Sequence, residues 1–179
     1  MQTNFTIAGL LSLIALLMFP SAQEAKGPFS STTIDFGIVV SDLEAAVEFY
    51  GKGLGFREVE GFQVDAEFCR DAGLTNSKPL DVRVFVLGEG PKATKVKLME
   101  VADTMPKTSD NAFIHSQLGF SYLTVYVSDM AGSLERLKNV GVSCLAKTPL
   151  ALGSGEHAPK LSLVCDPDGN LIELIGPNR

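Results

Sequence analysis

The sequence predicts an α+β fold of two βαβββ repeats, whose curved mixed sheets surround a shared cleft. The first observation is an internal repeat, because an apolar strand, a Ser-Asp pair and an amphipathic helix occur in that order at 33–50 and again at 121–137. The second is that both copies end in an apolar strand carrying one glutamate, Glu100 or Glu173. Such self-similarity is the signature of a repeated structural unit.

Each repeat opens with a strand that runs into an amphipathic helix. Ser41 is the expected N-cap of the first helix, with Glu44 at capping-box spacing, and Ser128 is the expected N-cap of the second. Glycines at 51–55 and Gly141 are expected to end the two helices. The buried stripes, at helical spacing, are Leu43–Ala46–Val47–Tyr50 and Met130–Leu134–Leu137.

The two repeats form one predicted domain over residues 31–176, divided into units 31–102 and 119–176 by a polar linker. The first unit is longer, and the excess falls at Val64–Pro79, where Asp65–Leu74 is expected to add a short helix. This insertion has two interpretations: a lid over the cleft, because loops on a rigid scaffold often set specificity, or surface decoration.

The chain closes with a tight turn and an alternating strand. Asp166-Pro167-Asp168-Gly169 is strong turn chemistry, since proline fixes its own φ and glycine accepts a positive φ. Strand periodicity then places Glu173 on the same face as Leu171 and Ile175. Because an unpaired buried carboxylate is costly, Glu173 either has a partner or lies in water near a sheet edge.

With these motifs the chain resembles the vicinal oxygen chelate superfamily, which includes glyoxalase I, methylmalonyl-CoA epimerase, extradiol dioxygenases and bleomycin-resistance proteins. The resemblance lies in the paired strand–Ser-Asp–helix openings, in Gly53-Leu54-Gly55-Phe56 and in the closing DPDGNLIEL, and it covers about residues 31–176. The closing motif is specific for the fold and says little about activity, because this fold hosts many functions.

The resemblance implies that metal ligands come from the first and last strand of each repeat, and the matching residues are Asp35, Glu100, Tyr122 and Glu173. The glutamates fit the family pattern, whereas histidine or glutamine is usual at the positions of Asp35 and Tyr122. Three carboxylates and a phenol form an oxygen-only set, which suits Mg²⁺, Mn²⁺ or Ca²⁺ better than zinc or nickel. Without a metal the converging carboxylates would repel, and at least one would hold its proton near neutral pH.

Two functions remain open from these residues. The first is a metal-assisted lyase or isomerase that moves a proton next to a carbonyl of a small oxygenated substrate, with Asp35 or Glu173 as base and Tyr122 as hydrogen-bond donor to the oxyanion. The alternative is a metal-free small-molecule binding protein of the bleomycin-resistance type. Extradiol dioxygenase chemistry is disfavoured, because the usual pair of histidines for iron is missing from the matching positions. The two units could pair within one chain or across a homodimer.

Residues 1–25 are interpreted as a signal peptide. The apolar stretch Ile7–Phe19 is too short to span a bilayer and has the length of a signal-peptide core, with small residues for cleavage after Ala22 or Ala25. Because Met1–Thr6 contains no Lys or Arg, a short membrane anchor is the alternative. The signal peptide predicts an exported protein, periplasmic or extracellular, without membrane contact after cleavage.

Composition agrees with one domain that has a sizeable core, since 45% of the 179 residues are hydrophobic and 20% are charged. The net charge of −6 provides no basic surface of the kind that binds nucleic acid. Cys69, Cys144 and Cys165 are an odd number for an exported protein. A disulfide between Cys144 and Cys165 is conceivable, but cysteine is also among the most buried residue types, and buried, reduced cysteines are favoured.

Overall fold

The computed structural model of this chain describes residues 28, 29, 31 and 33–178. The predicted signal peptide, residues 1–25, lies outside these. Among the described residues, no helix has the length and hydrophobicity needed to cross a membrane. Below, module 1 is residues 31–102 and module 2 is residues 119–176.

Module 1 is a four-stranded sheet with the strand order β1-β4-β3-β2. The first strand is parallel to the fourth, and the other neighbours are antiparallel. The elements of module 1 are β1 (Phe36–Val39), α1 (Leu43–Val47), the π-helical turn η1 (Glu48–Gly53), β2 (Arg57–Val64), α2 (Ala66–Asp71), β3 (Leu80–Val86) and β4 (Lys95–Met99).

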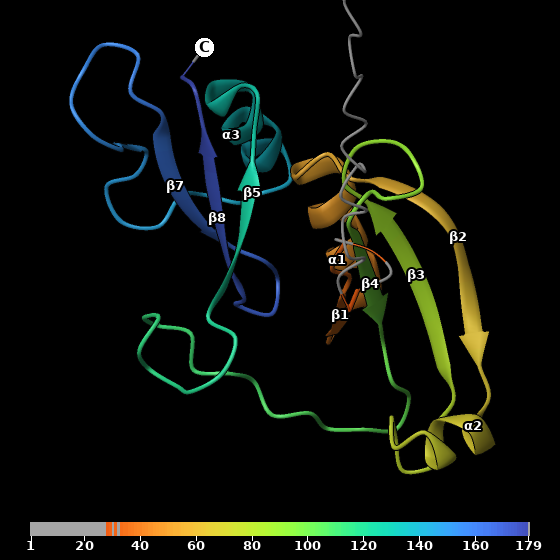
Figure 1. Cartoon of the computed structure of the whole chain (residues 1–179). Coiled ribbons are helices and arrows are strands. Elements are labelled where there is room, and N and C mark those ends of the chain that lie inside the picture. The colour runs from red at the N-terminus through yellow and green to blue at the C-terminus, as the bar shows by residue number, and fades with distance from the viewer. Residues whose placement is uncertain (1–27, 30, 32, 179) are drawn as a thin grey trace, which may run out of the picture. The chain divides into compact units, whose positions relative to one another are not determined.

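Module 2 repeats this topology, with the strand order β5-β8-β7-β6 and a parallel pair between its first and last strands. Figure 1 shows the two sheets as separate groups of strands, with α3 beside β5 and β8. The predicted α+β fold of two βαβββ repeats is therefore confirmed. The elements of module 2 are β5 (Tyr122–Tyr126), α3 (Met130–Asn139), β6 (Leu150–Ala151), β7 (Lys160–Cys165) and β8 (Leu171–Gly176).

Both helical stripes lie in one hydrophobic core that the two modules share. The fully buried members include Ala46 and Tyr50 of module 1 and Met130 and Leu137 of module 2. Leu43, Val47 and Leu134 pack against them. A Cβ placed on Gly53 would lie 3.0 Å from Val140 Cγ2, so η1 approaches the end of α3 as closely as a glycine allows.

The expected N-caps are each wrong by one residue. Asp42 caps α1, because its carboxylate accepts the Ala45 N–H at 3.0 Å, and it takes the capping role that was expected of Ser41. The Ser41 N–H donates instead to the Asp168 carboxylate across the module boundary. In module 2 the N-cap is Asp129 rather than Ser128, and the first helical N–H, that of Met130, donates to the Pro177 carbonyl at 2.9 Å.

The insertion in module 1 folds as expected around a short helix. Asp65 caps α2 by accepting the Phe68 N–H at 2.8 Å. Cys69 is fully buried in a second cluster with Leu80, Val82 and Val84, and Met99 packs against this cluster. Because Val82 and Val84 pair with Met99 and Lys97, α2 covers the sheet face that also carries Lys97.

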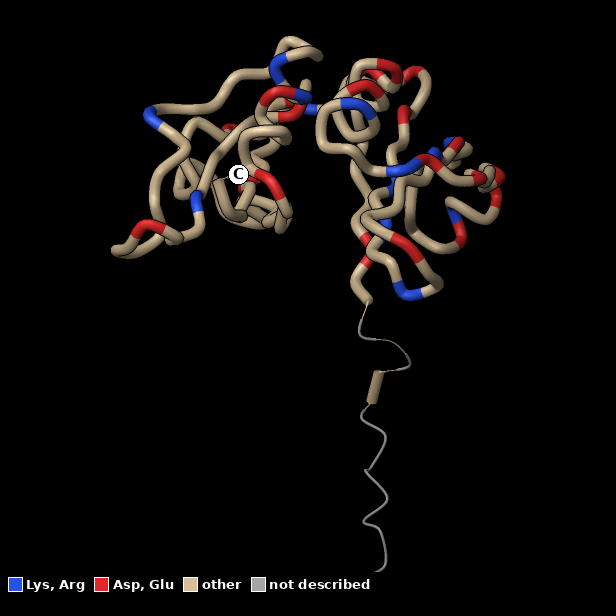
Figure 2. Tube along the Cα trace, turned by 90° about the horizontal axis from the view of Figure 1, so that it is seen from above, with Lys and Arg blue, Asp and Glu red and all other residues tan. Residues whose placement is uncertain are grey.

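All three cysteines are free thiols in the structure. Cys144 and Cys165 are both half-buried, and the Ser162 hydroxyl lies 3.2 Å from Cys144 Sγ. Burial and the nearby Asp166 carboxylate raise the pKa of the Cys165 thiol. Acidic and basic residues are interspersed along both modules (Figure 2), with no continuous basic stripe in the part of the chain that the structure describes.

Candidate functional site: a cavity between the modules

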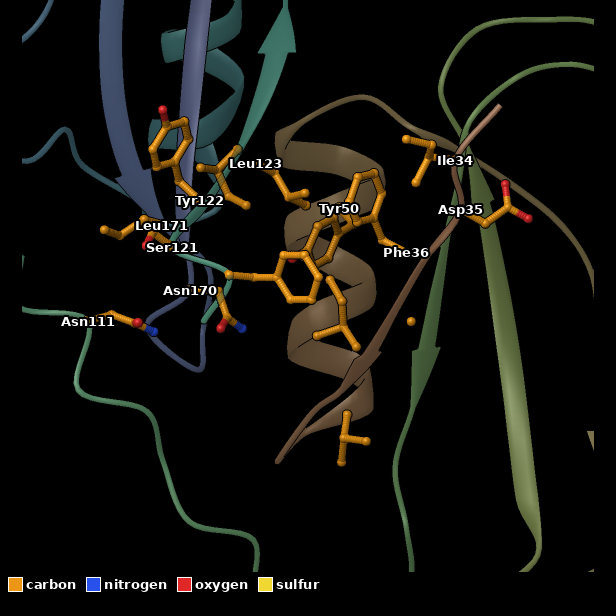
Figure 3. A pocket seen from close by; sticks show the side chains of 15 residues that line it. Ile34, Asp35, Phe36, Tyr50, Asn111, Ser121, Tyr122, Leu123, Asn170 and Leu171 are labelled. Atoms are coloured by element: carbon orange, nitrogen blue, oxygen red, sulfur yellow. The ribbon is translucent and has the colours of Figure 1, made fainter. Parts of the chain in front are cut away.

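The first strands of the two modules are both sheet edges, and a cavity of about 470 Å³ lies between them. Every residue of β1 lines this cavity, together with the start of β5 and the closing turn (Figure 3). Most of the lining is apolar or aromatic. The lining residues are Ile34, Asp35, Phe36, Gly37, Ile38, Val39, Tyr50, Asn111, Phe120, Ser121, Tyr122, Leu123, Asn170, Leu171 and Ile172.

Three uncharged polar side chains, Asn111, Ser121 and Asn170, stand among this apolar lining. Gln117 donates to the Asn111 amide oxygen at 2.9 Å, and the Ser121 hydroxyl donates to the Ile114 carbonyl at 3.2 Å. The linker and the turn before β8 thus supply fixed polar groups at the cavity wall. Among the described residues that line the cavity, Asp35 is the only charged one.

One wall of the cavity is fixed by a buried hydrogen-bond network around Asp166, whose exposed fraction is 5%. The Tyr50 hydroxyl donates to Asp166 Oδ2 at 3.0 Å, and Asn170 Nδ2 donates to the same atom at 2.9 Å. Asp166 Oδ1 accepts the N–H groups of Asp168 and Asn170 at 3.0 and 2.8 Å. The network joins η1 of module 1 to the closing turn of module 2.

The same network perturbs the ionisation of Tyr50. Burial, and then the charge and hydrogen bond of Asp166, raise the pKa of Tyr50 well above its usual range. The Tyr50 phenol is therefore a neutral hydrogen-bond donor at all physiological pH values. Its role at the cavity is to hold an aromatic wall in place rather than to exchange a proton.

Strand register shows which residues of the two modules are equivalent. The Val40 N–H donates to Met99 O at 2.9 Å, and the Val127 N–H donates to Ile175 O at 2.8 Å. Met99 therefore corresponds to Ile175, and the residue corresponding to Glu173 is Lys97. The expected equivalence of Glu100 and Glu173 is wrong by three positions.

Lys97 forms an ion pair with Asp35, one of the predicted metal ligands. Lys97 Nζ lies 3.2 Å from Asp35 Oδ2, and the Lys95 N–H donates to Asp35 Oδ1 at 3.3 Å. In Figure 3 the Asp35 carboxylate points away from Phe36 and Tyr50. Both carboxylate oxygens of Asp35 are thus engaged by groups of β4.

The other three predicted ligands are distributed over different surroundings. Glu100 is exposed and comes directly after β4. The parallel register places it beside Val40, so Glu100 lies roughly 16 Å from Asp35 along the strand direction. Tyr122 lines the cavity and is 49% exposed. Glu173 is half-buried, and its Oε2 accepts the Thr124 hydroxyl at 2.7 Å. Of the predicted four, Asp35 and Tyr122 line the cavity, and they lie on opposite sides of it (Figure 3).

This arrangement is a poor donor set for a divalent ion. A hard cation needs several oxygens that converge on one point, whereas Asp35 already faces an ammonium group and Glu100 lies at the far end of β1. Within the described ranges, no group of three or more His, Cys, Asp or Glu side chains is placed to hold a metal ion. A metal-binding role for Asp35, Glu100, Tyr122 and Glu173 stays a prediction, and the proposed catalytic roles of Asp35, Glu173 and Tyr122 stay predictions with it.

Sequence reasoning missed Lys97 and Asp166 as site residues, and it placed Tyr50 only in the core. The alternation of buried and less buried residues along the strand could have indicated Lys97. Glu173 alternates with the buried residues Ile172 and Leu174, and in β4 it is Lys97 that alternates with the buried Val96 and Leu98 in the same way. Nothing in the spacing pointed to the Tyr50–Asp166 hydrogen bond, which joins residues 116 positions apart.

Comparison with known proteins identifies relatives of this architecture. The family model described as the Glyoxalase/Bleomycin resistance protein/Dioxygenase superfamily matches residues 33–174. No curated protein matches the chain. Among solved structures, the chain is similar to a glyoxalase family protein from Bacillus cereus, with 18% identity, a TM-score of 0.66, and coverage of 87% of this chain and 100% of that one.

Two further structures share the fold. A point mutant of glyoxalase I from Zea mays has 17% identity and a TM-score of 0.57, with coverage of 80% of this chain and 44% of that one. TnmS3, an antibiotic-binding protein from Streptomyces sp. CB03234, has 22% identity and a TM-score of 0.52, with coverage of 83% of this chain and 97% of that one. At these identities the likeness establishes the fold alone.

Proposed function

Because this chain belongs to the glyoxalase/bleomycin-resistance/dioxygenase superfamily, we propose that it is a metal-free small-molecule binding protein whose ligand occupies the cavity between β1 and β5. The observation that carries the proposal is the cavity itself. Its volume of about 470 Å³ lies within the usual range of ligand sites, which are mostly apolar with a few placed polar groups.

The charged groups near the cavity support binding rather than acid–base chemistry. A general base must be able to reach the substrate and accept its proton. Asp35 is paired with Lys97, and Glu173 is not among the residues that line the cavity. The metal-assisted lyase or isomerase, which needs one of these carboxylates as a base, is therefore the weaker proposal.

The lining chemistry indicates the class of ligand. Rings such as Phe36, Phe120 and Tyr122 offer faces for stacking. The neutral Asn111 and Asn170 amides recognise carbonyl and hydroxyl groups. We expect an uncharged, largely aromatic molecule that carries carbonyl or hydroxyl substituents. The antibiotic-binding protein that shares this fold supports including aromatic antibiotics among the test compounds.

The test is calorimetric titration of a panel of such compounds into the EDTA-treated protein, with Phe120→Ala as the site variant. Phe120 lines the cavity and its side chain is fully exposed in the free protein, so its removal leaves the core intact. We expect affinity to fall about tenfold, as for an aromatic anchor of a binding site.

Leu118→Ala is the matched control, because Leu118 is equally exposed in the same segment and is not among the cavity residues. We expect it to bind as the unchanged protein does. Equal losses for Phe120→Ala and Leu118→Ala, or no binding of any compound, would contradict the proposal.

Export of the protein after removal of residues 1–25 is also a proposal, and it rests on the apolar stretch Ile7–Phe19. N-terminal sequencing of the protein secreted by a bacterial host tests it. A mature chain that begins after Ala22 or Ala25 is expected, whereas an intact N-terminus on cell-associated protein would contradict it.

A further inference from the structure

We propose that the ligand cavity has a second, apolar chamber, which receives one ring or short alkyl chain of an elongated ligand. This inference rests on the proposed function and specifies its ligand. The ligand would be an amphipathic molecule, with its polar groups in the outer cavity and an apolar end in the inner one.

The observation is a second cavity, of about 170 Å³, next to the first. The second cavity is called the inner chamber below, and the first is called the outer cavity. Five residues line both cavities: Phe36, Tyr50, Tyr122, Leu123 and Ile172. The two spaces therefore adjoin along these residues, which come from both modules, and the proposal requires that one ligand spans both. Phe36 and Tyr50 project from β1 and η1 toward the strand that carries Leu123 (Figure 3).

The chemistry of the inner chamber differs from that of the outer one. Leu54, Phe56 and Val96 contribute its apolar lining, and the asparagine amides of the outer cavity are not part of it. Four hydroxyl-bearing residues line it, and the hydroxyls of Tyr50 and Thr124 already donate to Asp166 and Glu173. The other two, Thr94 and Tyr122, stand among a lining that is mostly aliphatic and aromatic. A polar ligand group placed there would lose hydration and find few partners, so the chamber favours an apolar group.

The volume sets the size of that group. An engineered apolar cavity of about 150 Å³ binds benzene, and the inner chamber, which is partly open to solvent, has a similar volume. It accommodates one phenyl ring or an alkyl chain of about five carbons. The larger outer cavity keeps room for the functionalised part of the same molecule.

The test is a homologous series of 4-alkylbenzamides, from unsubstituted benzamide to the heptyl compound, titrated into the full chain. The benzamide end matches the aromatic and amide groups of the outer cavity. We expect affinity to rise about fourfold with each methylene that enters the inner chamber, and to level off near the pentyl compound.

Two variants fill the inner chamber without touching the outer one. Thr94 and Leu87 line the inner chamber and not the outer one. They lie at the loop end of the β3–β4 hairpin, where the Leu87 N–H donates to Thr94 O at 2.9 Å. We expect Thr94→Phe and Leu87→Trp to bind benzamide as the unchanged protein does, and to bind pentylbenzamide at least tenfold more weakly. Thr94→Val, of equal size, is the control and should retain the whole series.

The outcomes separate this inference from the proposed function. Suppose that benzamide binds and that Phe120→Ala weakens its binding. The second chamber is then overturned, and the outer site stands, if affinity does not depend on chain length. The same holds if both filled variants bind pentylbenzamide as tightly as the unchanged protein does. If benzamide and all its homologues fail to bind, the second chamber is overturned, whereas the outer site is judged separately by the panel titration with Phe120→Ala. Circular dichroism establishes that each variant is folded.

Discussion

At the scale of single residues, the Tyr50 hydroxyl joins the two modules through its hydrogen bond to Asp166. The pair is buried, and the carboxylate of Asp166 accepts four hydrogen bonds in all. A buried carboxylate is tolerable only when its oxygens are satisfied in this way. The DPDG turn, which the sequence showed only as turn chemistry, is therefore also the contact that fixes one wall of the cavity.

Tyr50→Phe should lower the free energy of unfolding at pH 7 by about 1–2 kcal/mol, because it removes one donor from a buried acceptor. Urea unfolding followed by circular dichroism measures this. Tyr126→Phe is the control, since Tyr126 is 76% exposed, and it should leave stability unchanged. Equal stabilities for Tyr50→Phe and the unchanged protein would contradict the structural role of the bond.

The same residue predicts a pH dependence of stability. The pKa of Tyr50 is raised in the folded state, so only the unfolded chain loses this proton near its ordinary value of about 10. The stabilisation is complete below pH 10 and is lost as the pH rises above it. Unfolding midpoints measured from pH 8 to 11 should fall less steeply for Tyr50→Phe than for the unchanged protein, and parallel curves would contradict this.

At the scale of elements, the helices were predictable from the sequence and the register of β4 was not. Apolar spacing located both helices, because their buried stripes recur at the helical period. The equivalence of Glu100 with Glu173 instead came from the position of a glutamate near the end of each last strand. Register depends on which backbone groups pair, and the bonds of Val40 and Val127 placed Lys97 there. A one-residue error in both N-caps has a similar origin, since serine and aspartate are equally good caps.

Gly53→Ala should destabilise the protein by about 1–3 kcal/mol, because the added methyl group would overpack the contact between η1 and α3. The methyl carbon would lie 3.0 Å from Val140 Cγ2 and 3.2 Å from Leu137 Cδ2. Adding Val140→Ala to Gly53→Ala should recover part of the loss, although Val140→Ala alone is neutral or destabilising. A double-mutant cycle measured by urea unfolding gives the coupling, and strictly additive effects would contradict the close contact.

At the scale of the whole molecule, the candidate site belongs to neither repeat alone. Each module supplies one edge strand, and the cavity lies where β1 and β5 face each other. The repeat predicted two similar sheets and a shared cleft, which the structure has. It could not predict the cleft's lining, because residues such as Asn111, Phe120 and Asn170 come from the linker and a turn. The two copies also diverge on the sheet face, since Lys97 in module 1 stands where module 2 has Glu173.

The measurement that tests the central claim most directly is calorimetric titration of one cavity ligand into the EDTA-treated protein, with and without 1 mM Mn²⁺ (on the order of the affinity of weak divalent sites). The account predicts equal dissociation constants in both conditions, and the same Phe120→Ala loss in each. Binding that appears only with Mn²⁺, and that Glu173→Gln abolishes, would contradict it and would support a metal-assisted site built on the predicted carboxylates.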